Sequence, residues 1–220
     1  NDGTFTPGSN TVRVYGTWDN NATTTMTGST VIFAATTSGP YDIDDADGTL
    51  NFNNLTFGET SGTASWSLAT TTDVDGILTV SFGTLSRDAR AISVGGNLTT
   101  NASGFWSGVG TTTFDSSNPS TWTVNNATKQ SIGRVVVDGS SKTLILGSNA
   151  LMESMTIGSD DTFDLSNSGY TASVQRGWTN NNIFLPRTGT VAFIATTTNH
   201  TITNGTSDFY NLTFNGVGGS

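Results

Sequence analysis

Residues 11–14 read Thr-Val-Arg-Val, and residues 30–33, 19 positions later, read Thr-Val-Ile-Phe. Polar and apolar residues alternate in the first segment, and the second segment has apolar residues at the matching positions, which is typical of a β-strand with one buried face. Such a shift is close to the length of one coil of a parallel β-helix. The echo therefore favours an all-β fold, a right-handed parallel β-helix (β-solenoid). Tandem β-sandwich domains are the alternative, but a sandwich has no reason to repeat at the length of one coil.

A second, longer period lies over the short one. Trp18 is followed by Leu98 and then by Trp178, and the segment at 54–57 has counterparts at 134–137 and at 211–214. Self-similarity at a fixed period of about 80 residues predicts stacked supersecondary units, here about four coils each. We expect one continuous solenoid, with Trp18 and Trp178 buried at equivalent places. Its units would be a partial repeat at 1–17, repeats at 18–97 and 98–177, and a partial repeat at 178–220.

The composition excludes several classes of protein. The chain has 220 residues, no cysteine, 11% charged residues and a net charge of −9. About a third of the residues are hydrophobic, which is too many for a disordered chain of such low charge. An acidic surface repels phosphate backbones, so we expect no nucleic-acid partner. No apolar run is long enough to insert into a membrane. The chain opens on Asn-Asp-Gly instead of Met, so we expect a mature or excised fragment.

Several phrases in the repeats resemble those of a known group of proteins. Residues 96–101 (Gly-Asn-Leu-Thr-Thr-Asn) and 177–181 (Gly-Trp-Thr-Asn-Asn) resemble a "GNWTNNG" phrase, 189–193 resemble "GTVTFNG", and 209–214 resemble "FYNLTI". Together they are similar to repeat-rich extracellular β-helix surface proteins of uncultured bacteria, and more loosely to adhesin repeats of the filamentous-haemagglutinin type. The resemblance implies an extracellular, repetitive β-solenoid at the cell surface. It implies no catalytic residue.

An acidic cluster is the sharpest chemical feature, and it consists of Asp42, Asp44, Asp45 and Asp47. Dense carboxylate oxygens suit Ca²⁺, so these residues are the candidate metal ligands, and calcium is the one cofactor considered. Their spacing departs from the calcium-loop pattern, because Ile43 and Ala46 occupy two of its ligand positions. The alternative is a set of solvated aspartates that favour turns.

Other residues suggest an interaction with carbohydrate. Trp66, Trp106 and Trp122 lie outside the matching repeat positions, so they are candidates for stacking on sugar rings, with burial in the core as the alternative. Arg87 and Arg90 flank Asp88 and form either a compact charged site or a salt-bridged turn. No motif for nucleophilic catalysis is present around the single histidine. We therefore expect no enzyme.

The function expected from these patterns is structural: a subunit of a cell-surface filament, or a segment of a stalk or adhesin. A solenoid has open ends with unpaired strand edges. The candidate edge residues are Thr11, Val12, Arg13 and Val14 at one end, and Leu212 and Phe214 at the other. Their expected partner is the protein itself in a head-to-tail homopolymer, or neighbouring repeats of a longer chain. Surface glycans are a further candidate partner. The alternative function is a carbohydrate-binding or polysaccharide-degrading β-helix protein.

Overall fold

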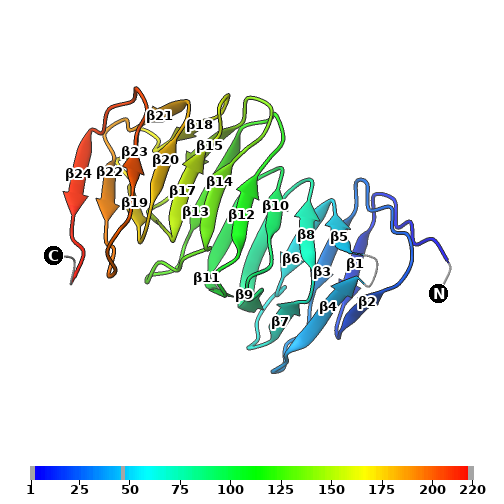
Figure 1. The fold of residues 1–220 in the computed structure, drawn as a ribbon. Helices are drawn as coiled ribbons and strands as arrows, with labels where there is room; N and C mark the ends of the chain where they lie inside the picture. The colour runs from blue at the N-terminus through cyan, green and yellow to red at the C-terminus, as the bar shows by residue number, and fades with distance from the viewer. Residues whose placement is uncertain (1–2, 46–47, 218–220) are drawn as a thin grey trace.

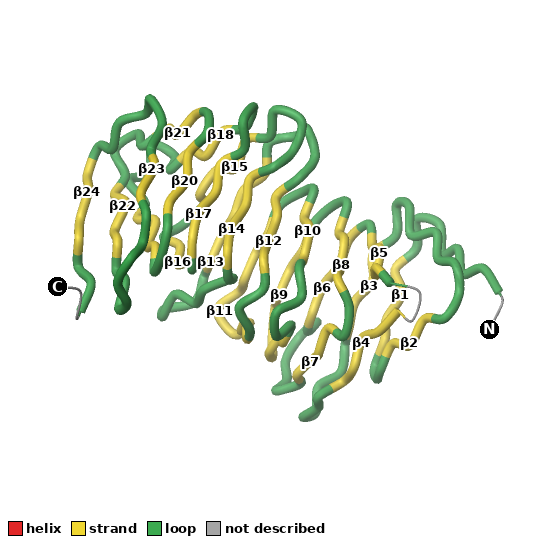
Figure 2. Tube along the Cα trace, viewed as in Figure 1, coloured by secondary structure: helices red, strands yellow, loops and turns green. Residues whose placement is uncertain are grey.

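The computed structural model describes residues 3–45 and 48–217, and they form one elongated β-solenoid of about ten coils (Figure 1). Strands and loops alternate throughout this part of the chain, and it contains no helix (Figure 2). Each strand pairs in parallel with the strand one coil away. This confirms the all-β solenoid, and the alternative of antiparallel sandwiches is wrong, since every pairing among these strands is parallel.

Three faces surround the core, and the first face has the longest run of strands. A parallel ladder connects its members from one coil to the next. The strands are β1 (Thr11–Val14), β3 (Thr30–Phe33), β6 (Asn54–Phe57), β9 (Leu78–Ser86), β11 (Leu98–Ser107), β13 (Ser120–Val124), β15 (Thr143–Leu146), β18 (Thr162–Asp164) and β21 (Ile183–Leu185).

The second face is an eight-stranded sheet. Its strands are β5 (Thr49–Phe52), β8 (Thr71–Val74), β10 (Ile92–Val94), β12 (Thr111–Phe114), β14 (Arg134–Val137), β17 (Ser154–Ile157), β20 (Trp178–Asn180) and β23 (Ile202–Thr203).

The third face is built in two parts. The first part is β2 (Trp18–Asn20), β4 (Tyr41–Asp45) and β7 (Ser65–Leu68), which pair onward with the ends of the long strands β9 and β11. The second part is a four-stranded sheet of β16 (Ala150–Met152), β19 (Thr171–Val174), β22 (Thr190–Phe193) and β24 (Asn211–Phe214). An isolated bridge between Ser131 and Leu151 leads into this second part.

The coils differ in length, and the residues that pair between neighbouring strands show which coils are longer. Thr11 pairs with Thr30, and Thr30 pairs in turn with Asn54, so the second of these coils is longer than the first. The short echo between 11–14 and 30–33 is therefore confirmed as one coil. The extra residues of longer coils lie in the loops between strands, where insertions cost little.

Residues that are one long period apart do not lie on the same face of the solenoid. Asn54 begins β6 on the first face, Arg134 begins β14 on the second, and Asn211 begins β24 on the third. From β6 the chain makes three coils to β13 and then crosses two further faces to reach β14. The period is thus about three and two-thirds coils, which falls short of the four expected.

For the same reason, the expectation that Trp18 and Trp178 are buried at equivalent places is wrong. Trp18 lies on the third face in β2, where it is half-buried, whereas Trp178 lies on the second face in β20 and is fully buried. They therefore do not occupy equivalent places. Trp18 has fewer coils around it because it lies in one of the first coils described.

Inward side chains form ladders that run along the solenoid axis. On the second face one ladder includes Val135, Met155 and Trp178 and continues to Ile202. On the third face Val174 and Phe193 stack in register, and both are buried. Outward positions on the same strands are only partly covered. The core is therefore a continuous apolar column, and its stability comes from contacts between neighbouring coils.

Candidate functional site

Strand geometry disperses the acidic cluster expected to bind calcium. Asp42 and Asp44 point outward from β4, whereas the carboxylate of Asp45 is buried and accepts a hydrogen bond from Asn20 Nδ2 at 3.0 Å. Successive side chains of a strand point to opposite faces, so these three carboxylates do not converge. Asp47 lies outside the described residues. Within residues 3–45 and 48–217, no group of three His, Cys, Asp or Glu side chains is placed to hold a metal ion.

The three tryptophans considered as candidates for stacking on sugars are buried. The exposed fractions are 1% for Trp66, 8% for Trp106 and 0% for Trp122. Trp66 and Trp122 belong to inward ladders, and Trp106 Nε1 donates a hydrogen bond to Thr100 Oγ1 at 2.8 Å. Their rings therefore lie in the core, which is the alternative named for them from the sequence.

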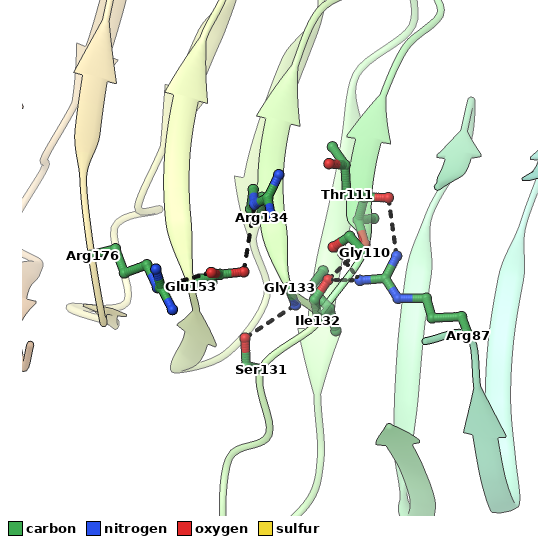
Figure 3. Close-up of polar contacts among 10 residues, drawn as sticks. Arg87, Gly110, Thr111, Ser131, Ile132, Gly133, Arg134, Glu153 and Arg176 are labelled. Carbon is green, nitrogen blue, oxygen red and sulfur yellow. Dashed lines mark hydrogen bonds and ion pairs between the residues drawn. The ribbon is translucent and has the colours of Figure 1, made fainter. Parts of the chain in front are cut away.

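Arg87 does not form the salt-bridged turn expected with Asp88. Its side chain is buried, and its guanidinium donates to three backbone carbonyls in the two following coils, those of Thr111, Gly110 and Ile132 (Figure 3). The guanidinium also lies 5.4 Å from the centre of the Trp106 ring. Burial lowers the pKa of Arg87 to about 10. The residue therefore fastens three coils together from inside one corner.

That corner is the edge where the third face turns into the second, and one row of residues runs along it. The register places Arg90, Gly110, Gly133, Glu153, Arg176 and His200 one above the other, one in each successive coil. We call this set the corner row. Adding a Cβ to Gly110 would place it 1.9 Å from the carbonyl oxygen of Arg90, so the coils are too close here for a side chain.

Glu153 is the acidic centre of the corner row, and two arginines flank it (Figure 3). Arg176 Nε lies 2.9 Å from Glu153 Oε1, and Arg134 Nε lies 3.7 Å from Oε2. The second distance is an ion-pair contact that is too long for a hydrogen bond, so Oε2 has no hydrogen-bond partner. The Glu153 side chain is 12% exposed, whereas those of Arg134 and Arg176 are 59% and 58% exposed.

A shallow groove of about 210 Å³ opens beside this cluster. Its walls come from successive coils and combine hydroxyl, amide, glycine and charged groups with one apolar side chain. The lining residues are Gly108, Val109, Ser131, Gly133, Glu153, Gln175, Arg176, Thr196 and Thr197. Val109 is exposed to solvent despite being apolar. The groove is therefore a polar surface beside two exposed cations and one partly covered carboxylate.

The two end regions expected to associate are also placed by the structure. At the first end, Arg13 forms an ion pair with Glu59, in which Arg13 Nη2 lies 2.6 Å from Glu59 Oε1. Val12 and Val14 beside it are half-buried. At the other end, Leu212 and Phe214 are exposed by 43% and 68%. Each continues a ladder whose preceding member is buried, Val191 for Leu212 and Phe193 for Phe214.

Sequence reasoning missed the cluster of Arg134, Glu153 and Arg176. A signal was present, because Glu153 follows Arg134, and Arg176 follows Glu153, at intervals close to the length of one coil. Opposite charges that recur at coil spacing are expected to stack along a β-solenoid. The comparison at the long period concealed this signal, since it pairs residues on different faces.

Residues 3–45 and 48–217 contain no helix long and apolar enough to cross a membrane. Comparisons of the chain with protein-family models, with curated proteins and with solved structures found no match.

Proposed function

We propose that the protein is a structural β-solenoid that lengthens by end-to-end association, as a subunit of a cell-surface filament or stalk. The observation that carries this proposal is the uncovered ladder at β24. Leu212 and Phe214 occupy positions that are buried in the coils before them, and β24 pairs with β22 alone among the described strands. A strand edge above exposed apolar side chains is a template for another parallel strand.

The order of the faces supports a second copy of this chain as the partner. Along the chain the faces follow in the order first, third, second, and β24 ends the described part on the third face. The segment around Phe5 bridges to Thr24, which follows β2 and precedes β3, so it belongs to the second face. A second copy stacked head to tail would thus continue the order without a gap.

The opposite end offers a matching apolar surface. Phe5 is exposed, Trp18 is half-buried, and their rings lie 6.1 Å apart. Stacking would place β2 of one copy next to β24 of the other on the third face. Such a heterologous contact does not close on itself, so it generates a filament. Neighbouring coils of a longer chain would cover the same surface in the same way.

The proposed cell-surface location rests on composition and on resemblance. The chain is rich in Thr, Ser, Asn and Gly, it has no cysteine, and its net charge is −9. The phrases at 177–181 and 209–214 resemble those of extracellular β-helix surface proteins. The proposed role is non-enzymatic.

Sedimentation velocity and negative-stain electron microscopy test the association. We expect the chain to form larger species as its concentration rises, with filaments one solenoid wide. The double variant Leu212→Lys/Phe214→Lys places two charges on the end surface and should remain monomeric. Ile77→Lys is the matched control, because Ile77 is an exposed apolar residue away from both ends of the solenoid. A wild-type chain that stays monomeric at every concentration, without polymers, would overturn the proposal.

A further inference from the structure

We propose that the corner between the third and second faces binds a linear anionic glycan, whose acidic groups are recognised by Arg90, Arg134 and Arg176. This inference does not depend on end-to-end association. It rests on the distribution of positive charge, on the spacing of the three arginines and on the chemistry of the groove between them.

The chain has few positively charged side chains, and most of them form ion pairs or hydrogen bonds within the fold. The chain has eight Lys and Arg residues against 17 Asp and Glu. Arg13 and Arg187 are paired with Glu59 and Asp164. The other three engaged cations donate to carbonyl or hydroxyl oxygens, and they are Arg87, Lys129 and Lys142.

The remaining three cations lie along the same corner. Arg90 is exposed and forms no ion pair within the described part of the chain, while Arg134 and Arg176 share the single carboxylate of Glu153. An acidic protein that gathers its least engaged cations on one edge attracts anions there against its overall charge.

The arginines recur at a regular interval along the solenoid axis. Arg90 lies two coils before Arg134, and Arg134 lies two coils before Arg176, each within one residue of the same register position. Neighbouring strands are about 4.8 Å apart, so two coils span about 10 Å. A flexible peptide has no such fixed repeat, whereas an extended polysaccharide presents its carboxylate or sulfate groups at constant intervals. The row is therefore suited to a periodic, extended polyanion.

The groove distinguishes a glycan from a nucleic acid. Glu153 would repel a DNA backbone, whose phosphates and deoxyriboses offer no hydrogen-bond donor to it. A sugar presents hydroxyl groups as well as acidic groups, and a hydroxyl can donate to Glu153 Oε2, which has no hydrogen-bond partner. Arg134 is 3.7 Å from this oxygen and mostly exposed, so it can move to a ligand anion and uncover Oε2.

The uncharged lining fits the same class of ligand. Ser131, Thr196 and Thr197 supply hydroxyl groups, and Gln175 supplies an amide. These groups both donate and accept hydrogen bonds, which matches the hydroxyls of a sugar. The exposed Val109 offers an apolar contact for the carbon face of a pyranose ring.

Fluorescence anisotropy with a labelled oligogalacturonate tests the proposal. Its methyl ester is the matched probe, because it keeps the sugar chain and removes the charges. We expect the wild-type chain to bind the acid form and to release it as salt concentration rises. The ester should bind at least about tenfold more weakly, because charge-assisted hydrogen bonds to arginine are lost.

The double variant Arg134→Gln/Arg176→Gln should weaken binding of the acid form at least about tenfold. Arg13→Gln/Arg187→Gln is the matched control, since it removes the same charge from two cations paired elsewhere. It should bind as wild type does, and circular dichroism checks that all variants are folded. Absence of wild-type binding, equal binding of the ester, or an unchanged affinity in the first double variant would overturn the proposal. Equal or tighter binding of polyuridylate would also overturn it, in favour of a general polyanion surface.

Discussion

Replacing Trp178 with Ala should cost more stability than any other single truncation in the second face. The side chain is fully buried, and its ring contacts those of Phe163, Phe184, Phe193 and Phe209 at centroid distances of 4.9 to 6.4 Å. These four rings come from successive coils and from two other faces. Trp178 therefore holds the coils together as well as filling the core.

The magnitude follows from two losses. Truncation of a buried tryptophan typically costs about 3–5 kcal/mol through lost burial and the cavity left behind. Trp178 Nε1 also donates to Asn204 Oδ1 at 2.9 Å, and an unsatisfied partner costs about 1–3 kcal/mol where it is buried. Since four rings would have to move to fill the space, we expect Trp178→Ala to lower the free energy of unfolding by about 5 kcal/mol. Trp178→Phe keeps a ring and should lose about half as much.

Urea unfolding followed by far-ultraviolet circular dichroism measures these changes, and amide hydrogen exchange locates them. Exchange should accelerate first in β20, β22 and the segment around Phe209, because a solenoid opens coil by coil. Trp18→Ala is the matched control, since Trp18 is only half-buried and makes no hydrogen bond from its ring among those described. If Trp178→Ala costs no more than Trp18→Ala, the packing described for this part of the solenoid is wrong.

Three further changes test other parts of the fold. Arg87→Met removes the donors to three carbonyls and should lower the free energy of unfolding by about 1–3 kcal/mol, and an unchanged urea midpoint would contradict the clamp. Gly133→Ala should destabilise the corner, because Gly133 has a φ of +79° and a Cβ would meet the carbonyl of Gly110; thermal unfolding at an unchanged temperature would refute this. The pKa of Asp73 is raised, mainly by burial and then by Asp115 and Asp75, so the folded chain holds this proton more tightly than the unfolded chain. Wild-type stability should therefore fall as pH rises from the usual aspartate pKa through the raised one, and Asp73→Asn should be more stable than wild type at pH 7 but not at pH 3; a constant difference at all pH values would count against the assignment.

The coil was predictable from sequence because it depends on local signals. Alternation in 11–14, with apolar residues at the matching positions of 30–33, indicates one buried face, and turn-forming residues mark where each strand ends. The in-register pairing of these two segments is a direct consequence, since a one-residue slip would turn the buried Val31 and Phe33 outward. The number of coils and the face to which each strand belongs did not follow in the same way, because loops of varying length set them.

The burial and the hydrogen-bond partners of the charged residues could not be predicted from local sequence signals. The buried guanidinium of Arg87 and the buried Nζ of Lys142 donate to oxygens that are not carboxylates, whereas sequence reasoning expects a buried charge to be paired with an opposite charge. Their partners are backbone carbonyls and serine hydroxyls at the corners, for example Gly95 O and Ser120 Oγ for Lys142. Backbone oxygens leave no trace in a sequence motif, and only the path of the coils shows where they gather.

The long period also failed to show which tryptophans are buried. Trp66 and Trp122 have no tryptophan counterpart at the long period, which made them seem independent of the core. At coil spacing they do have ladder partners, Leu85 for Trp66 and Leu98 for Trp122. Burial in a solenoid is decided by the neighbour one coil away, and the variation in coil length hides that neighbour from a comparison at one fixed shift.

The mismatch between the two periods also bears on function. Because the long period makes about three and two-thirds coils, the counterparts of Arg134 fall at Asn54 on the first face and Asn211 on the third. Residues that recur at the long period lie on a path that winds around the solenoid and does not follow one edge. The line of Arg90, Arg134 and Arg176 follows one edge, so it cannot result from the long repeat. The three arginines recur at coil spacing within a single corner, so their alignment is a feature of the coil stacking and is separate from the long repeat.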